Sequence, residues 1–501
     1  MLLGKFVLSI DQGTTGTTVI LFNQKSEIVG KVYQEFEQYY PRSGWVEHDA
    51  SEIWEVTKNL LQKIISDTKI DPEEIAAIGI TNQRETVVLW DRKTGKPVTR
   101  AIVWQCRRTA TLCEELRERG LEPLFKEKTG LVLDPYFSGT KIKWIFDRDS
   151  HLKERAQRGE IAFGTIDSWL IYNLTGGEKH ITDYSNASRT LLYNIAELKW
   201  DEELLNILNI PREILPEVRS CSEIYGETVS LGNFPKGIPI SGSAGDQQAA
   251  LFGQACYEPG TVKATFGTGA FILMNTGSEL ISSPNGLLTT IAWDLNGQIE
   301  YALEGSVFVA GAAVQWLRDE MEMLVEAADS EPLALSVPDA NGIYFVPSFV
   351  GLGAPHWDPY VRGMIMGISR GVTKAHIVRA TLESIIYQTK EVLDIMATDS
   401  NISVTQLKVD GGASVNNFIC QFLSDLTKTK VQRPRIFETT ALGAAYLAGL
   451  AVGFWKDQEH IRELWQVDTV YTPAMEEGKR LELYQGWKRA VQSAKSWKNI
   501  D

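Results

Sequence analysis

The chain has 501 residues, and its 64 acidic residues outnumber its 50 basic ones to give a formal net charge of −14, which argues against a general binder of nucleic-acid phosphates. Hydrophobic residues at 44% and charged residues at 23% exclude a disordered or collagen-like chain. Since a single hydrophobic core stops growing near ~250 to 300 residues, we expect at least two domains.

The N-terminal segment predicts a strand, a turn rich in glycine and threonine, and a second strand. Apolar and β-branched residues at 6–10 and 19–22 flank this turn. Glycine allows close backbone approach, so that N–H groups can cradle phosphate oxygens, and threonine hydroxyls add donors. Asp11, directly before the turn, could hold Mg²⁺ or orient water on it. An ordinary hairpin is the alternative interpretation of this turn.

Residues 51–68 have the periodicity of an amphipathic helix, and residues 75–80 that of a buried strand. A polar cluster follows this strand: Asn82, Gln83, Arg84, Glu85 and Thr86. Adjacent opposite charges at a strand end are more often a surface ion pair, which is the alternative to a functional site here. Trp104 follows the apolar residues 101–103, where core packing is the ordinary interpretation.

Near the midpoint of the chain, Asp246 and Gln247 follow small residues at an apparent helix start, where a helix N-cap is the simpler interpretation. Residues 262–275 then repeat the opening plan, with Gly267, Thr268 and Gly269 between two apolar segments. Two similar halves indicate two related α/β domains that face each other. We place their boundary near residue 253, which gives domains 1–253 and 254–501.

In the C-terminal half, residues 407–410 predict a strand that ends in Gly411 and Gly412, and a helix follows from about Asn416. A nucleotide between two domains needs phosphate donors from both sides and a slot for its base, which these glycines and Asn416 could supply. The uncharged residues 441–455 are too few to span a bilayer and predict a close-packed buried helix. The mixed charges of residues 475–500 predict a solvated face.

Several common kinds of site are missing from the sequence. It has neither the Walker pattern nor the Gly-x-Gly-x-x-Gly fingerprint, and its five cysteines and six histidines lack metal-ligand spacing. We therefore expect free thiols and neither a zinc site nor a Ser-His-Asp arrangement. Because the sequence shows neither a membrane segment nor a signal-type start, we expect a cytoplasmic protein.

Taken together, these segments resemble the glycerol kinases of the FGGY carbohydrate kinase family over nearly the whole chain. The resemblance is carried by residues 44–48, 80–86, 134–141, 244–253, 351–355 and 363–383. It implies an α/β protein with two related domains of the actin/hexokinase/Hsp70 (ribonuclease H-like) fold and an ATP cleft between them. The implied reaction is ATP-dependent phosphorylation of glycerol to sn-glycerol 3-phosphate, which feeds glycerol catabolism and lipid precursor supply. The implied assembly is a homodimer or homotetramer.

The resemblance also implies roles for individual residues. Those implied to contact the glycerol hydroxyls are Arg84, Glu85, Tyr136, Asp246 and Gln247, with Trp104 and Phe271 against the carbon face. Those implied to bind ATP are Thr14, Thr15 and Gly16 on one lobe, and Thr268, Gly311, Gln315, Gly412 and Asn416 on the other. Asp11 and Asp246 are the candidates for the Mg²⁺ that accompanies ATP, and Asp246 is also the candidate base for the attacking hydroxyl.

The chain departs from the family pattern in its first loop. Many glycerol kinases have two serines and an arginine after the paired threonines, whereas this chain has Gly16, Thr17 and Thr18. One positive charge beside the nucleotide is therefore missing. In addition, residues 231–238 carry a single lysine and a proline, and residues 221–227 contain no histidine. By comparison with regulated members of the family, we expect insensitivity to fructose 1,6-bisphosphate and to the phosphocarrier protein.

Two other functions stay open at this point. One is a kinase for another short polyol or ketose. The other is an ATP-driven switch or filament module of the actin or Hsp70 type, which would use the same cleft without a small substrate. The complete set of residues expected around a triol favours glycerol over both.

Overall fold

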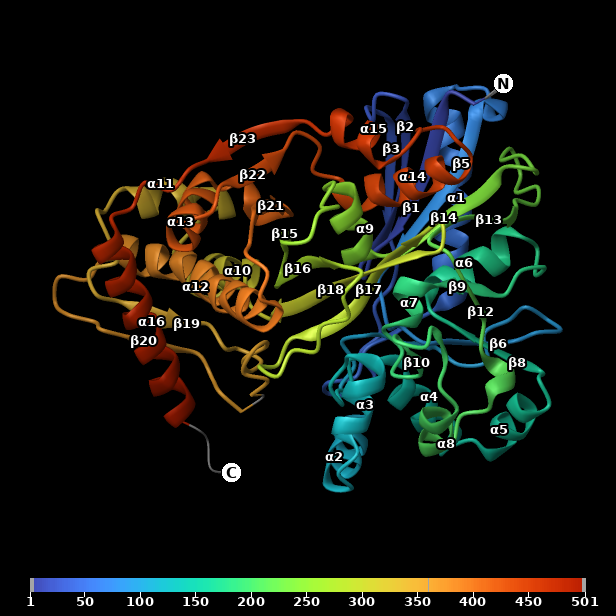
Figure 1. The fold of residues 1–501 in the computed structure, drawn as a ribbon, viewed down its shortest axis with the longest axis horizontal. Helices are drawn as coiled ribbons and strands as arrows, with labels where there is room; N and C mark the ends of the chain where they lie inside the picture. The colour runs from blue at the N-terminus through green and yellow to red at the C-terminus, as the bar shows by residue number, and fades with distance from the viewer. Residues whose placement is uncertain (1–3, 359, 498–501) are drawn as a thin grey trace.

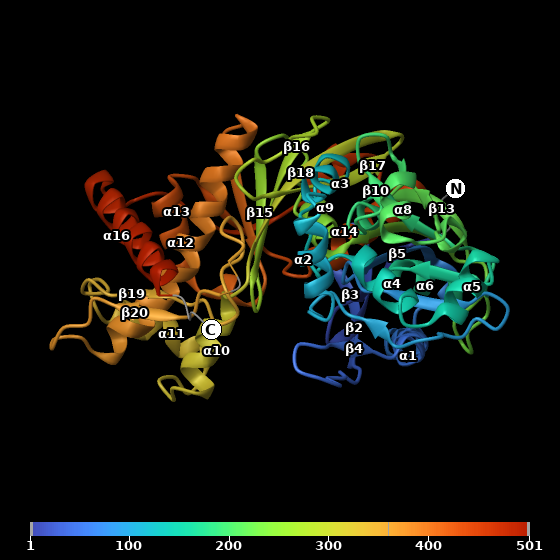
Figure 2. The ribbon, with the colours of Figure 1, turned by 90° about the horizontal axis from the view of Figure 1, so that it is seen from below.

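The computed structural model of the protein describes residues 4–358 and 360–497. Residues 1–3, which belong to the expected non-signal start, and residues 498–500 of the last predicted helical stretch lie outside this part. The described chain forms two large mixed sheets with helices packed against them, together with five two-stranded sheets (Figure 1). From below, most of the blue-to-green part lies on one side of the molecule and most of the orange-to-red part on the other (Figure 2).

The first sheet has six strands in the order β13-β14-β5-β1-β2-β3. Their bounds are β1 (Phe6–Gln12), β2 (Gly16–Asn23), β3 (Ile28–Glu35), β5 (Ile75–Asn82), β13 (Ser222–Glu227) and β14 (Pro239–Gly245). β5 runs parallel to both β1 and β14, whereas β1 and β2 form an antiparallel hairpin. The predicted strands at 6–10, 19–22 and 75–80 are confirmed.

Helices cover both faces of this sheet. On one face lie α1 (Ala50–Thr68) and α6 (Ile166–Leu174); on the other lie α9 (Asp246–Gly253) and α14 (Thr439–Ala451). α14 is the predicted close-packed helix, and Gly79 of β5 makes its approach possible, because a Cβ there would lie 2.1 Å from the carbonyl oxygen of Ala444. We keep the domain boundary near residue 253 as a proposal, with α14 as an element from beyond it that packs on the first sheet.

The second sheet has seven strands in the order β17-β18-β16-β15-β21-β22-β23. Their bounds are β15 (Thr261–Phe266), β16 (Ala270–Gly277), β17 (Leu288–Leu295), β18 (Gln298–Val307), β21 (Gln406–Asp410), β22 (Val431–Pro434) and β23 (Val467–Tyr471). The hairpin β15–β16 repeats the plan of β1–β2, and β15 runs parallel to β21 as β1 does to β5. The predicted internal repeat is therefore confirmed.

The helices of the second half include α10 (Gly311–Asp319), α11 (Ser330–Leu335), α12 (Lys374–Ser400), α13 (Asn417–Thr427) and α15 (Gln458–Leu464). α16 (Glu477–Ser496) was expected to be a solvated face, and this prediction is wrong for one side of the helix. Trp487 is fully buried and its ring stacks on Tyr387 with 5.3 Å between centroids. The charged residues of α16 lie on its other side, away from this buried face.

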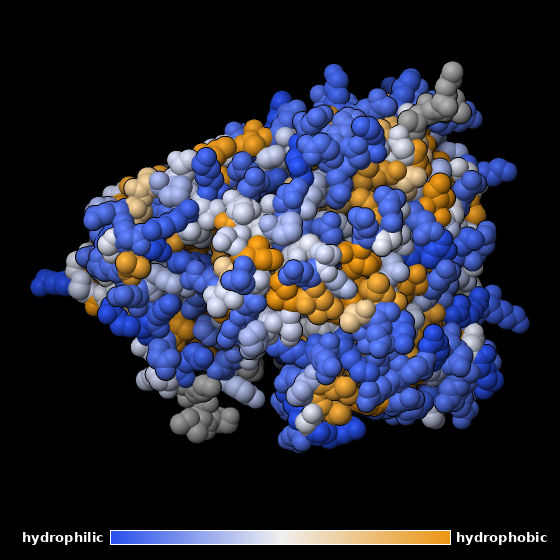
Figure 3. Space-filling model, in the orientation of Figure 1, coloured by the Kyte–Doolittle hydropathy of each residue, from blue (hydrophilic) through white to orange (hydrophobic). Residues whose placement is uncertain are grey.

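Shorter elements between β5 and β13 form the lower centre and lower right of Figure 1. They include β6 (Val88–Asp91), β7 (Ala101–Ile102), α2 (Ala110–Glu118), α3 (Glu122–Thr129), α4 (Ser138–Phe146), α5 (Ser150–Gln157), β8 (Ile161–Gly164), β9 (Ile181–Asp183), α7 (Tyr184–Ala187), β10 (Tyr193–Asn194), β11 (Lys199–Trp200), α8 (Glu202–Leu208) and β12 (Glu217–Arg219). The face shown in Figure 3 is largely hydrophilic, and its outline is indented between the two halves. All five cysteines are buried and free. None of the described helices is long and apolar enough to cross a membrane.

Candidate functional site

Three parallel strands of the first sheet end side by side. Gln12 of β1 and Gly245 of β14 both pair with Asn82 of β5. The segments that leave these strands are the first Gly/Thr turn, the Arg84–Glu85 pair and the Asp246–Gln247 pair. The carboxyl ends of parallel strands are a common place for ligand sites. The topology thus brings together segments that lie far apart in the sequence.

Arg84 and Glu85 do not form a surface ion pair, and that alternative is wrong. Their side chains are 2% and 1% exposed. Arg84 lies across the backbone of Gly245, where a Cβ would come within 2.6 Å of its Cδ, and its Nε is 3.2 Å from Oδ1 of Asp246. Glu85 has φ of 60°, and Ser138 donates to its carbonyl oxygen at 3.1 Å. Left-handed backbone at a non-glycine residue is strained and concentrates at functional sites.

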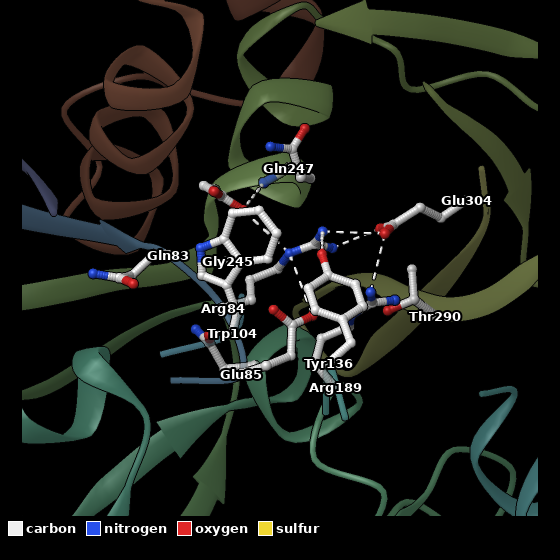
Figure 4. A network of polar contacts seen from close by, with 12 residues as sticks. Gln83, Arg84, Glu85, Trp104, Tyr136, Arg189, Gly245, Gln247, Thr290 and Glu304 are labelled. Carbon is white, nitrogen blue, oxygen red and sulfur yellow. Dashed lines mark hydrogen bonds and ion pairs between the residues drawn. The ribbon is translucent and has the colours of Figure 1, made fainter. Parts of the chain in front are cut away.

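Two buried residues absent from the predicted site complete a charge network around this pair (Figure 4). Glu304 of β18 accepts from Arg84 at 2.6 and 3.1 Å and from Arg189 at 3.0 Å. Arg189 also donates to Glu85 at 2.7 Å. Burial raises the pKa of Glu304, but Arg189 and Arg84 outweigh it and hold that pKa at about 2. The network joins the two halves, because Glu304 belongs to the second sheet.

Lys263 of β15 is a third buried residue that the sequence prediction missed. Its ammonium donates to Oε1 of Gln247 and, at 3.0 Å, to the hydroxyl of Thr265. Burial lowers the pKa of Lys263 to about 8. Because Lys263 occupies the amide oxygen, Gln247 keeps its NH₂ group as a donor. A charged residue inside an apolar strand is the available signal for both Lys263 and Glu304, since buried charges need partners.

Three aromatic residues stand beside this polar cluster. The ring of Trp104 lies edge-on to Tyr136 at 5.5 Å and to Phe271 at 6.3 Å between centroids. Trp104 is half-buried, so it is not simply a core residue, and its Nε1 donates to the hydroxyl of Thr14 at 2.9 Å. Arg84 donates to the hydroxyl of Tyr136 at 3.3 Å. The arrangement offers an apolar wall opposite charged donors and acceptors, which suits a small polyhydroxy molecule.

Asp246 is the first residue of α9, and the N-cap is Gly245, so the simple N-cap interpretation of Asp246 is wrong. Its side chain remains 30% exposed. Burial raises the pKa of Asp246, opposed by Arg84 and Lys263. Burial, followed by the negative charges of Asp246 and Glu438, raises the pKa of Asp11 to about 7. The carboxylates of Asp11 and Asp246 thus repel each other, and a bound cation would relieve this repulsion.

The residues expected to bind the nucleotide lie on the two hairpins and nearby helix starts. In the first turn the N–H of Gly13 donates to the carbonyl oxygen of Gly16 at 3.0 Å; in the second, Gly267 donates to Gly269 at 2.9 Å. Gly311 starts α10 directly against the second turn, where a Cβ would lie 2.5 Å from the carbonyl oxygen of Gly267. Thr268 accepts from the backbone N–H groups of 310 and 312.

The remaining predicted residues of this group lie further along the second half. Gly411 has φ of 83° and packs on the backbone of Phe266, at the end of β15. The next residue, Gly412, is exposed, and the space on its Cβ side is open. Asn416 caps α13, and Gln315 is exposed on α10. Thr15 is exposed in the first turn, and a Cβ at Gly16 would overlap the ring of Tyr33.

Comparison with known proteins matches both halves of the chain to one protein family. Residues 6–253 match the N-terminal domain of the FGGY family of carbohydrate kinases, and residues 262–452 match its C-terminal domain. The glycerol kinase of Alkaliphilus metalliredigens is 58% identical over 493 residues, which cover 98% of this chain and 99% of that protein. Glycerol kinase 2 of Thermotoga maritima is 59% identical with the same coverage.

Solved structures share the architecture. The glycerol kinase of Plasmodium falciparum with ADP has a TM-score of 0.93 and 38% identity, and the match covers 98% of both chains. The xylulose kinase of Lactobacillus acidophilus has a TM-score of 0.90 over 98% of this chain and 99% of that one. Its 23% identity shows the common fold alone. The prediction of two α/β domains with the fold of these kinases is confirmed.

Proposed function

The chain belongs to the FGGY family of carbohydrate kinases, and we propose that its reaction is the ATP-dependent phosphorylation of glycerol to sn-glycerol 3-phosphate. The observation that carries the proposal is the constellation of Arg84, Glu85, Tyr136, Asp246 and Gln247 beside the Trp104 and Phe271 rings. Each glycerol hydroxyl both donates and accepts, so a triol needs carboxylates as acceptors and guanidinium, phenol or amide groups as donors.

In the reaction, Asp246 accepts the proton of the attacking hydroxyl. The hydroxyl oxygen forms a bond to the γ-phosphorus, the bond from that phosphorus to the bridging oxygen breaks, and ADP leaves. An alcohol is too weak an acid to lose its proton early, so the transfer comes late, as the new bond forms. The raised pKa of Asp246 suits this acceptor role, and Arg84, 3.2 Å away, keeps the carboxylate in place.

The phosphates would lie between the two hairpins, with Thr14, Thr15 and Gly16 on one side and Thr268 and Gly311 on the other. Gln315, Gly412 and Asn416 would bind the adenosine. Asp11 and Asp246 fit a Mg²⁺ ion, because their mutual repulsion favours a cation and this ion is usually bound by one or two carboxylates together with substrate phosphates. Such an ion would neutralise charge on the transferred group.

An assay of ADP release across several acceptors tests the proposal. We expect release with glycerol to exceed that with dihydroxyacetone, xylulose or no acceptor. Preference for xylulose or dihydroxyacetone would favour the polyol or ketose kinase. Release of the same size with no acceptor would favour the ATP-driven switch, because a switch needs no acceptor. A glycerol kinase should instead distinguish the acceptors, since a poorly fitting molecule leaves polar groups of the site unpaired.

Thr18 gives a prediction for the nucleotide side. It stands between Asp11 of β1 and Tyr33 of β3 in the first sheet, half-buried at the first hairpin. Because a charged donor binds phosphate more strongly than a hydroxyl, we expect Thr18→Arg to lower the KM for ATP about threefold to tenfold. Steady-state kinetics at saturating glycerol measure it, with Thr18→Gln as an uncharged control. An unchanged KM together with an unchanged kcat in Thr18→Arg would contradict it.

The expected cytoplasmic location, the expected homodimer or homotetramer, and the expected insensitivity to fructose 1,6-bisphosphate and the phosphocarrier protein stay predictions. In the segment 231–238, Leu231 and Phe234 close a tight turn through two backbone hydrogen bonds, and Asn233 donates to Ser66 of α1 at 3.1 Å. A turn held in this way supports the expectation of a stiff loop.

A further inference from the structure

The segment 44–48 carries part of the family resemblance, but the proposed reaction uses none of its residues. Within it, His48 is fully buried, and its ring packs edge-on against Phe36 at 5.0 Å. The two ring nitrogens meet two glutamines: Nε2 lies 2.7 Å from Oε1 of Gln38, and Nδ1 lies 3.4 Å from Nε2 of Gln83. Burial lowers the pKa of His48 to about 4, so the ring is neutral at pH 7.

The neighbours of the two glutamines determine which nitrogen carries the proton. Nε2 of Gln38 faces the carbonyl oxygens of Thr14, at 3.1 Å, and Phe36, at 3.3 Å. Since carbonyl oxygens only accept, this end of the Gln38 amide must be its NH₂ group, and its oxygen must face His48. Nε2 of His48 is therefore the donor, and Nδ1 is the acceptor that the Gln83 amide meets.

The same chain of bonds continues to the glycerol side. Nε2 of Gln83 also donates to the carbonyl oxygen of Gly13 at 3.1 Å. Oε1 of Gln83 accepts from the Thr86 hydroxyl at 2.9 Å, which accepts from the backbone N–H of Trp104 at 3.3 Å. The side chain of Trp104 then returns to Thr14. The backbone of the first hairpin is thus held on one side through Gln38 and on the other through Gln83, and His48 lies between them.

We propose that His48 is a positioning residue that fixes the first phosphate hairpin relative to the glycerol site by orienting Gln38 and Gln83. The proposal rests on the proposed function, because it needs ATP at this hairpin. His48 itself touches neither substrate. Without its donor and acceptor, the amides of Gln38 and Gln83 each lose one of the hydrogen bonds that orient them, and they hold the carbonyls of Thr14 and Gly13 less firmly. The consequence is poorer ATP binding and transfer with little change in glycerol binding.

The test compares His48→Leu with His48→Gln. Leucine removes both polar atoms, whereas the glutamine amide nitrogen reaches about as far as Nε2 and can still donate to Gln38. We expect kcat/KM for ATP to fall about tenfold or more in His48→Leu, since small misplacements of a binding group have large effects on rate. The KM for glycerol should stay within about twofold, and His48→Gln should recover most of the loss.

His180→Leu is the matched control. This histidine belongs to the same half, its Nε2 lies 2.7 Å from the carbonyl oxygen of Phe163, and its ring packs on Trp90 at 5.1 Å. We expect it to lower the melting temperature without an ATP-specific change. Equal effects on ATP and glycerol in His48→Leu, or a His48→Gln variant no better than His48→Leu, would overturn the proposal.

Two further measurements keep the test decisive. If His48→Leu does not fold, Gln38→Leu at the half-buried neighbouring position should give the same ATP-specific loss, and normal ATP kinetics there would overturn the proposal. ADP binding, followed with a fluorescent analogue, should weaken in the same variants. This binding does not depend on the acceptor, so a wild-type protein inactive on glycerol would contradict the proposed reaction and leave the role of His48 measurable.

Discussion

Replacing Asp246 by asparagine is expected to lower kcat by about 10²-fold or more, because the amide cannot accept the proton of the attacking hydroxyl. Glycerol affinity should change much less, since the proton is transferred only as the new bond forms and the asparagine side chain has nearly the same size and shape as that of aspartate. Steady-state kinetics measure kcat, and calorimetric titration with glycerol measures the affinity.

Asp294→Asn is a suitable control for this substitution. Asp294 of β17 is also buried, and burial raises its pKa, but it contributes to neither the charge network nor the hairpins. The control should alter thermal stability and leave kcat near the wild-type value. A folded Asp246→Asn protein that keeps near-normal kcat would remove Asp246 from the role of base.

Replacing Glu304 by glutamine should have the second large effect. Two buried guanidinium groups, those of Arg84 and Arg189, lose their shared carboxylate. Breaking a buried ion pair costs roughly 3 to 5 kcal/mol of stability. Because Arg84 then no longer holds its place beside Asp246, we expect kcat/KM for glycerol to fall about 10²-fold or more. Glu300→Gln is the control, since Glu300 lies on the same strand but bonds to Asn275 instead.

The stability difference between wild type and Glu304→Gln should depend on pH. The folded-state pKa of Glu304 is about 2, below its ordinary value of 4.5, so the carboxylate contributes stability above about pH 4.5 that is lost as the pH falls toward 2. At pH 4 the difference should be smaller than at neutral pH by roughly 1 kcal/mol. Urea unfolding at several pH values measures it, and a constant difference between pH 7 and pH 4 would contradict this account of Glu304.

The elements with strong local patterns could be predicted from the sequence. The two Gly/Thr hairpins, the strand before Arg84 and the apolar helix α14 all follow from runs of residues that need only their own neighbours to be interpreted. The solvated-face prediction for α16 failed because composition does not show on which side of a helix the charges lie, and Trp487 turned out to be buried.

The charge network could not be predicted in the same way. Glu304 is a charged residue among apolar neighbours, which indicates a buried partner, but that partner, Arg84, is separated from it by 220 residues along the chain. Arg189 lies outside every motif that carries the family resemblance. The ordinary preference for surface ion pairs also misled the interpretation of Arg84 and Glu85, whose burial depends on contacts from the second sheet.

Measuring ADP and phosphorylated glycerol in the same reaction tests the central claim most directly. With wild-type protein, Mg²⁺ and ATP, we predict equal amounts of ADP and sn-glycerol 3-phosphate, and little ADP when glycerol is left out. The product can be identified by ³¹P NMR and a stereospecific coupled enzyme. ADP formed without phosphorylated glycerol, or at the same rate in the absence of glycerol, would contradict the assignment of this site to glycerol.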